Sequence, residues 1–176
     1  MTYDMSGREF AQKAKDLIGL SYSQCDCIGV VRKALGIRIQ GTNWLWRSVN
    51  NSAKYKYLYD RHNTAPYDAV EDGLVVFRIK WDEIPSGYTD KPNAHHVGVL
   101  IYEKGKWSVI QSNPSTGVCL SDYHDAQWDG YGKMKFVLYE KNGPQVSLPA
   151  EENRPEVELT DHEMIKAIYY KIIEGD

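Results

Sequence analysis

The part of the chain that follows Gly73 is a succession of short segments rich in β-branched and aromatic residues. Glycine, proline, aspartate and asparagine, which favour turns, separate these segments from one another. The segments are GLVVFRIK, HHVGVLIY, KWSVIQS, GVCL and KMKFVLYE. This pattern predicts an antiparallel sheet of about five strands.

Two helices are predicted before the sheet. The stretch 6–19 has apolar residues at helical spacing, and Ser6 and Glu9 form a capping box at its start. The apolar face of this helix comprises Phe10, Ala14, Leu17 and Ile18. A second helix is expected from near Asp26 to Leu35, with a glycine directly after it. The predicted fold class is therefore α+β, with N-terminal helices packed on the antiparallel sheet. The pattern does not decide whether the sheet curls into a barrel.

The remaining segments suggest how the chain is divided. Residues 41–67 are aromatic and polar without clean periodicity, which indicates a long, partly helical excursion within a domain spanning 1–140. Residues 141–159 carry three prolines and an acidic bias, as expected of an extended linker or strap. Residues 160–176 read as an amphipathic helix. Its apolar stripe needs cover, either on the chain's own body or against a second copy in a homodimer.

Composition and charge narrow the class of protein. With 176 residues, 42% hydrophobic and 26% charged, the chain is typical of a soluble globular domain. A net charge of −3 without basic clusters argues against a nucleic-acid partner. We find no signal peptide and no apolar run of membrane-spanning length, so we expect synthesis in the cytoplasm without a membrane span. Three cysteines are an odd number, which favours reduced thiols over a disulfide framework.

Cys27 is the candidate nucleophile. It falls in the first turn of the second predicted helix, where the helix dipole and free N–H groups favour a thiolate. The alternative is a small buried residue, since free cysteines are commonly buried and inert. The spacing of Cys25 and Cys27 is poor zinc geometry, so we predict no metal and no cofactor. Cys25 and Cys119 are expected to be bystanders.

A catalytic cysteine also needs an imidazole base and a polar group that orients the ring. His95 and His96 begin a predicted strand, and strand alternation sends them to opposite faces. The pattern does not say which of them faces the helix. Gln111, in the next strand, offers an amide to a ring nitrogen. The alternatives are a structural or solvated histidine and a glutamine on the exposed face of its strand.

Three of these segments carry a family resemblance. DCIGVVRKALGI resembles the DCSGLV helix of the NlpC-type cell-wall cysteine peptidases, which have a papain-like fold, and HHVGVLI is similar to their HVGIY strand. EDGLVVF resembles the GDLVFF strand between them, and GLSYSQCDC resembles their tyrosine-containing lead-in. The resemblance covers about residues 8–120. It implies that Cys27 is the nucleophile, His96 the base, Gln111 the polar third member, and Tyr22 a neighbour that helps hold the oxyanion or substrate.

The same resemblance implies a cysteine endopeptidase that hydrolyses amide bonds in peptidoglycan stem or cross-link peptides. Asp26 would help bind the substrate's amino terminus, but Ile28 replaces the family's serine and halves that contact. Asp72 and Gly73 replace the glycine and aspartate of GDL. Two alternatives remain open: a thiol amidase or acyltransferase of the same fold, and a catalytically idle phage or cell-wall assembly module. The implied place of action is the bacterial cell wall, after phage-type release or delivery.

Trp44 and Trp46 are further candidates for substrate binding. They are two positions apart in the aromatic stretch, and Tyr55, Tyr57 and Tyr59 are spaced in the same way. Alternate residues of an extended segment lie on one face, so one face of this region is a candidate aromatic surface. On this hypothesis, the rings line a cleft beside Cys27 and hold a glycan or peptide. Packing in the core is the alternative.

Overall fold

The structure, a computed structural model, describes residues 5–48, 57–63 and 70–139. These residues belong to one compact unit, Met1–Gly143. The predicted linker 141–159, the predicted helix 160–176 and its pairing in a homodimer lie outside the described residues.

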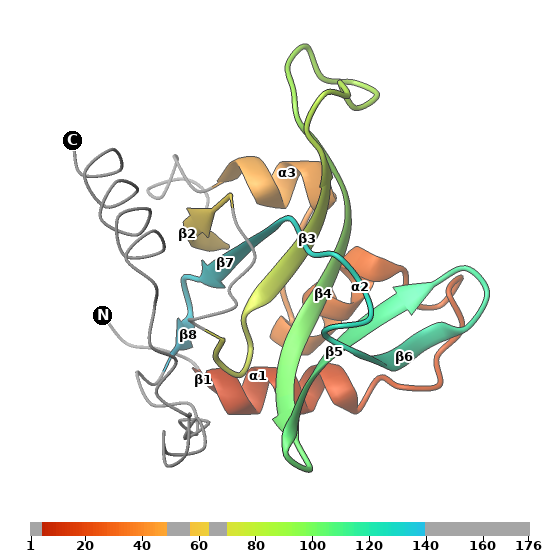
Figure 1. The fold of residues 1–176 in the computed structure, drawn as a ribbon, viewed down its shortest axis with the longest axis vertical. Coiled ribbons are helices and arrows are strands. Elements are labelled where there is room, and N and C mark those ends of the chain that lie inside the picture. Colours follow the sequence, from red (N-terminus) through yellow and green to blue (C-terminus); the bar gives the residue numbers. More distant parts are fainter. Residues whose placement is uncertain (1–4, 49–56, 64–69, 140–176) are drawn as a thin grey trace, which may run out of the picture. The chain divides into compact units, whose positions relative to one another are not determined.

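The centre of the unit is a six-stranded sheet with the order β2-β7-β3-β4-β5-β6, in which every neighbouring pair is antiparallel (Figure 1). Its strands are β2 (Leu58–His62), β3 (Val75–Lys80), β4 (Asn93–Glu103), β5 (Lys106–Asn113), β6 (Gly117–Asp122) and β7 (Gly130–Met134). Two short strands, β1 (Met5–Ser6) and β8 (Val137–Leu138), pair in parallel. The protein thus combines helices with an antiparallel sheet, as predicted.

The strand prediction differs from the structure at two places. The segment KMKFVLYE is not one strand, because a turn at residues 135–136 separates the end of β7 from β8. Strand β2 was not expected, since it arises within the aromatic stretch from the polar sequence LYDRH. Among the described strands it lies at the edge of the sheet and pairs with β7 alone, and its register is irregular. An edge strand of this kind shows no regular alternation of apolar and polar residues.

Helices α1 (Gly7–Lys15), α2 (Cys27–Leu35) and α3 (Thr42–Arg47) cover one face of the sheet. Figure 1 shows the connection between β6 and β7 crossing the opposite face. Trp128, in that connection, is almost fully buried there. The described helices include none that is long and apolar enough to cross a membrane.

The capping box of α1 is present as predicted. The Glu9 N–H donates to Ser6 Oγ (3.1 Å), and the Ser6 N–H donates to Glu9 Oε2 (3.2 Å). Phe10 and Ala14 are buried, but the helix ends at Lys15, before the predicted boundary. A turn follows, so Ile18 is 42% exposed and does not belong to the buried face.

The central strands are buried on both faces. In β4, Val97, Val99 and Ile101 pack in the core beneath the helices, whereas Leu100 packs in a second core on the other face. The second core comprises Leu74, Val76, Leu100, Trp107, Val109, Tyr123 and Trp128. Burial on both faces explains why GLVVF reads as a continuous apolar run rather than an alternating one.

Candidate active site

Helix α2 begins and ends where the sequence predicts. The Asp26 side chain caps it, because Oδ1 accepts the Gly29 N–H at 2.7 Å. Arg32, one turn further on, forms an ion pair with the same carboxylate. Gly36 ends the helix in the left-handed conformation, with φ of 67°, which glycine adopts at no steric cost. Cys27 is consequently the first residue of the helix, as the nucleophile hypothesis requires.

The Cys27 thiol is buried, and its hydrogen-bond partner is a threonine. Its Sγ lies 3.9 Å from Thr42 Oγ1, and the backbone N–H groups of Val97 and Ile28 act to lower the pKa of the thiol. Burial raises the pKa of the thiol; the Thr42 hydrogen bond opposes this effect, and the Asp26 carboxylate raises the pKa further. The protonated thiol is therefore the resting form at neutral pH. In this site, burial outweighs the favourable position at the start of the helix.

His96 and Gln111 form a hydrogen-bonded pair. The distance between His96 Nε2 and Gln111 Oε1 is 2.6 Å, and Gln111 Nε2 in turn donates to Ser121 Oγ at 2.6 Å. With the amide in this orientation, Nε2 is the protonated ring nitrogen and Nδ1 keeps its lone pair. The ring stacks on Trp128, with centroids 5.9 Å apart and an interplanar angle of 23°. These contacts hold the imidazole in one orientation and one tautomer.

The structure distinguishes the two adjacent histidines. His95 is exposed, whereas His96 is half-buried and carries the glutamine contact. Burial lowers the pKa of His96 from its ordinary value, the hydrogen bond to Gln111 opposes this, and the charges of Arg78 and His95 lower it again. The imidazole is therefore neutral at pH 7 and is available as a base.

The His96–Gln111 pair and helix α2 meet at a fork in the sheet. Pairing between β4 and β5 stops at Gly98 and Gln111, and the β5–β6 hairpin then diverges from β4 (Figure 1). The loop before α2 lies against the diverging hairpin, because Ser112 Oγ donates to the Cys25 carbonyl at 2.5 Å. The N–H of Val97, the residue after His96, acts to lower the pKa of the Cys27 thiol, which relates this part of β4 to the start of α2.

The three predicted catalytic residues thus gather at this fork without forming a continuous hydrogen-bonded chain. The side chains of Gln111 and His96 belong to the face that carries Trp128 and the second core. Cys27 belongs to the core beneath the helices. Both Cys27 and His96 are described, and no hydrogen bond joins the Cys27 sulfur to the imidazole; its side-chain partner is Thr42.

Tyr22 and Asp26 lie together beside the start of α2. They line an open pocket of about 440 Å³. The other lining residues are Ser23, Gln24, Cys25, Gly29, Arg32 and Lys33. Burial raises the pKa of the Tyr22 hydroxyl, and the Cys27 thiol, once ionised, and the Asp26 carboxylate raise it further, so the hydroxyl remains a hydrogen-bond donor at neutral pH. These two predicted substrate-binding residues are therefore accessible and adjacent to the candidate nucleophile.

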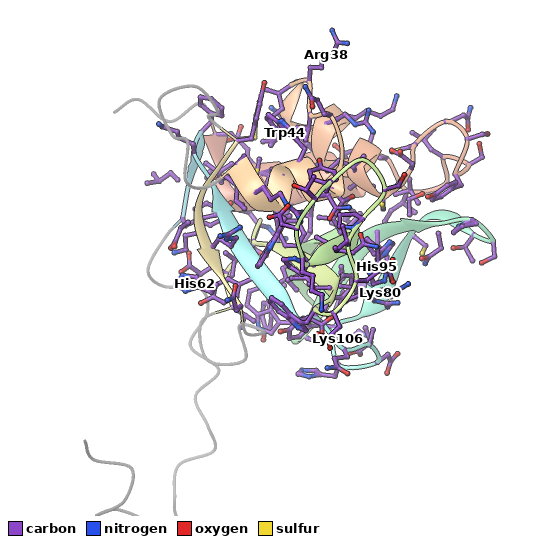
Figure 2. The ribbon with its side chains drawn as sticks, turned by 90° about the horizontal axis from the view of Figure 1, so that it is seen from above. Arg38, Trp44, His62, Lys80, His95 and Lys106 are labelled. Carbon is purple, nitrogen blue, oxygen red and sulfur yellow. The ribbon has the colours of Figure 1, made fainter. Side chains whose placement is uncertain are left out.

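The two tryptophans have different surroundings. Both lie on α3, so the predicted common face is wrong: residues two positions apart on a helix point in different directions. Trp46 is 2% exposed and packs edge-on against Phe77, as the core alternative states. Trp44 is partly buried on the helix side of the molecule, with its ring 5.2 Å from that of Tyr57 (Figure 2). Tyr55 and the side chain of Tyr59 lie outside the described residues.

Several residues at the site were not identified from the sequence. Thr42 contacts the thiol from the start of α3, and Ser121 and Trp128 hold the His96–Gln111 pair. Ser121 lies on the same face of the sheet as Gln111, so strand alternation was a usable signal for it. Thr42 and Trp128 come from an irregular stretch and a loop, where no periodic pattern marks a residue's neighbours.

The remaining cysteines, predicted to be bystanders, differ in burial. Cys25 is 2% exposed in the core, Cys119 is partly exposed on β6, and all three cysteines are free thiols. Within the described part of the chain, no group of three or more histidine, cysteine, aspartate or glutamate residues is arranged to hold a metal ion.

Comparisons with known proteins assign neither a family nor a function to this chain. A scan against protein-family models finds no match. Searches of curated proteins and of solved structures likewise find none.

Proposed function

We propose that the protein is a cysteine peptidase with a papain-like, NlpC-type domain, which hydrolyses amide bonds in peptidoglycan stem or cross-link peptides. The observation that carries this proposal is the 2.6 Å contact between His96 Nε2 and Gln111 Oε1, which orients an imidazole in a protein whose helix α2 opens with Cys27. An oriented imidazole with a free Nδ1 is the base that a thiol nucleophile requires. The cell-wall substrate comes from the sequence resemblance.

The reaction follows from the roles of these groups. His96 Nδ1 takes the proton of the Cys27 thiol, and the sulfur attacks the scissile carbonyl carbon to give a tetrahedral intermediate. The Cys27 N–H, which is free at the start of α2, and the Tyr22 hydroxyl stabilise the oxyanion. The imidazolium then gives its proton to the leaving amine as the C–N bond breaks, which leaves a thioester. Water, deprotonated by His96, hydrolyses the thioester and restores the thiol.

The resting site holds a neutral thiol and a neutral imidazole, because burial raises the pKa of Cys27 and lowers that of His96. Proton transfer between them therefore accompanies attack, and no ion pair is stored beforehand. Gln111 stabilises the imidazolium that forms, since its oxygen accepts the Nε2 proton. Substrate binding must also bring the sulfur and Nδ1 into hydrogen-bond contact.

Two matched pairs of variants test the proposal. We expect Cys27→Ala to abolish the loss of turbidity of purified cell walls, and the adjacent control Cys25→Ala to retain it. His96→Ala should likewise abolish activity, whereas His95→Ala should retain most of it. Mass spectrometry of the released fragments identifies the cleaved bond and separates a stem-peptide endopeptidase from an amidase that cuts the sugar–peptide link. Wall clearance by Cys27→Ala at the parent rate would refute the mechanism.

A second candidate is a catalytically idle cell-wall or phage assembly module. It is favoured by the lack of a hydrogen bond between Cys27 and His96 and by the raised pKa of the thiol. On this hypothesis the protein sediments with purified walls but releases no new amino termini from them. Cys27→Ala would then bind walls as the parent does, and neither protein would change the fragment pattern.

A further inference from the structure

A separate pocket lies at the C-terminal end of α3. It has a volume of about 250 Å³, and its walls come from α3, from the end of β2 and from the connection between β3 and β4 (Figure 1). The lining residues are Trp46, Arg47, Arg61, Asn63, Trp81, Asp90, Lys91 and Pro92. They do not include Cys27, His96 or Gln111, so this pocket is distinct from the candidate active site.

The pocket carries an excess of positive charge. Its lining has three cations, Arg47, Arg61 and Lys91, against one anion, Asp90, in a chain whose formal net charge is −3. Asp90 pairs with Arg47 at 3.6 Å, and Asp82, outside the lining, pairs with Lys91 at 3.4 Å. Both carboxylates are exposed, so water screens these pairs. Arg61 forms no ion pair with any described residue, and its charge is therefore the one that remains without an anion.

The guanidinium of Arg61 is held in one position. Its Nη1 donates to the Trp46 carbonyl at 2.7 Å, and its central carbon lies 4.9 Å from the centre of the Trp46 ring. The hydrogen bond uses one of the five N–H groups of an arginine, so others remain to bind a ligand. Because the side chain is already ordered, little conformational entropy is lost when a ligand binds to it.

Two guanidinium groups face this pocket. Burial lowers the pKa of Arg61, and the charge of Arg47 lowers it further. Arg47 donates from Nη1 to the Asn43 side chain and from Nη2 to two carbonyls of the β3–β4 connection, so it adds charge to the pocket rather than hydrogen bonds. The C-terminal end of a helix carries only about half an elementary negative charge. The end of α3 therefore does not balance both guanidinium groups, whereas an anion in the pocket would.

We propose that this pocket binds the phosphate group of a small phosphorylated sugar. The inference is independent of the proposed peptidase function. Arg61 donates two parallel hydrogen bonds to the phosphate, Lys91 contacts a third oxygen, and Arg47 contributes its charge. A carboxylate has only two oxygens and one charge, so it would leave Lys91 without a contact.

Trp81 gives the pocket an apolar wall. It is 41% exposed and meets Trp46 edge-on, with ring centroids 6.3 Å apart. A sugar ring packed against the indole removes apolar surface from water. The pocket volume of about 250 Å³ lies below the range of about 300–1,000 Å³ that is typical of sites for drug-sized ligands. The space therefore suits one phosphate and one ring.

The test titrates ribose 5-phosphate, ribose and inorganic phosphate into the full-length protein by calorimetry. We expect ribose 5-phosphate to bind, inorganic phosphate to bind more weakly and ribose not to bind. Arg61→Gln should weaken the binding of ribose 5-phosphate by about 10- to 100-fold, the effect of losing one charge-assisted contact. Lys106→Gln removes the same charge at the opposite end of β4 and is the matched control, which should keep the parent's affinity (Figure 1).

Two further variants change exposed side chains and are expected to fold as the parent does. Lys91→Gln should weaken the binding of both phosphate compounds, and Trp81→Ala should reduce the affinity for ribose 5-phosphate to that for inorganic phosphate. If Arg61→Gln does not fold, these variants decide: weaker binding in either one supports the inference, and unchanged binding in both overturns it.

Three results with the other proteins would also overturn the inference. One is that neither ribose 5-phosphate nor inorganic phosphate binds the parent at millimolar concentrations. Another is that ribose binds as tightly as ribose 5-phosphate, since the phosphate would then contribute nothing. The third is that a folded Arg61→Gln protein binds ribose 5-phosphate as tightly as the parent, which would place the ligand elsewhere on the protein.

Discussion

The Asp26 carboxylate has two roles that substitution can separate. It caps α2 through the Gly29 N–H, it pairs with Arg32, and its charge raises the pKa of the neighbouring Cys27 thiol. Asp26→Asn keeps a capping oxygen but removes the charge, because asparagine is as good a capping residue as aspartate. Asp26→Ala removes both.

The two variants should differ in stability. Loss of a capping side chain costs about 1 kcal/mol. The ion pair with Arg32 adds at most about 1 kcal/mol, because the two side chains are 44% and 35% exposed. We therefore expect Asp26→Ala to lower the free energy of unfolding by about 1–2 kcal/mol and Asp26→Asn by at most about 1 kcal/mol. The corresponding fall in Tm for Asp26→Ala is roughly 3–6 °C.

The chemical effect should be the same in both variants. Removing the charge lowers the pKa of the Cys27 thiol, so alkylation by iodoacetamide at a fixed pH near 8 should be faster than in the parent. The rate is read by intact mass in a background carrying Cys25→Ala and Cys119→Ala, so that only one thiol reacts. Urea unfolding of the same proteins gives the stability difference.

Two results would refute this reasoning. Equal stability of Asp26→Ala and the parent would mean that the observed cap contributes nothing to α2. Slower alkylation of Asp26→Asn, with the fold intact, would mean that the carboxylate does not hold the thiol in its protonated form.

Three further predictions concern the fold around the site. Burial lowers the pKa of His96 in the folded protein, so the unfolded chain takes up a proton first as the pH falls. The stability associated with this group is therefore complete above the ordinary histidine pKa near 6.5 and declines below it. Urea unfolding between pH 8 and 5 should show this decline, and His96→Gln should reduce it. Gly98→Ala should destabilise the protein by roughly 1–3 kcal/mol in thermal unfolding, because the new methyl group meets Val109 Cγ1; an unchanged Tm would contradict the packing. Trp46→Ala should lower the free energy of unfolding by about 3–5 kcal/mol or prevent folding, whereas Trp44→Ala should lower it by less. If Trp44→Ala folds, a raised KM would support a role of Trp44 in substrate binding, and an unchanged KM would argue against it.

Local features were predictable because their signals lie within a few residues. Ser6 with Glu9, and Asp26 with Gly36, mark helix boundaries through hydrogen bonds made inside one turn. Strands β3 to β6 were found because each is a short β-rich run between turn residues. That one of the two adjacent histidines meets Gln111 was also predictable, since the two strands are consecutive and joined by a short turn.

The main helices, the central antiparallel sheet and the residue types proposed for catalysis could all be predicted from sequence patterns. Which histidine meets Gln111 depends on long-range packing, because strand alternation separates two faces of a sheet without showing which segments cover each face. The cover comes from distant segments: Trp128 fixes His96 and Arg78, and Thr42 contacts Cys27. The pKa of the thiol was likewise decided by burial, which depends on every element packed around it rather than on the helix that carries it.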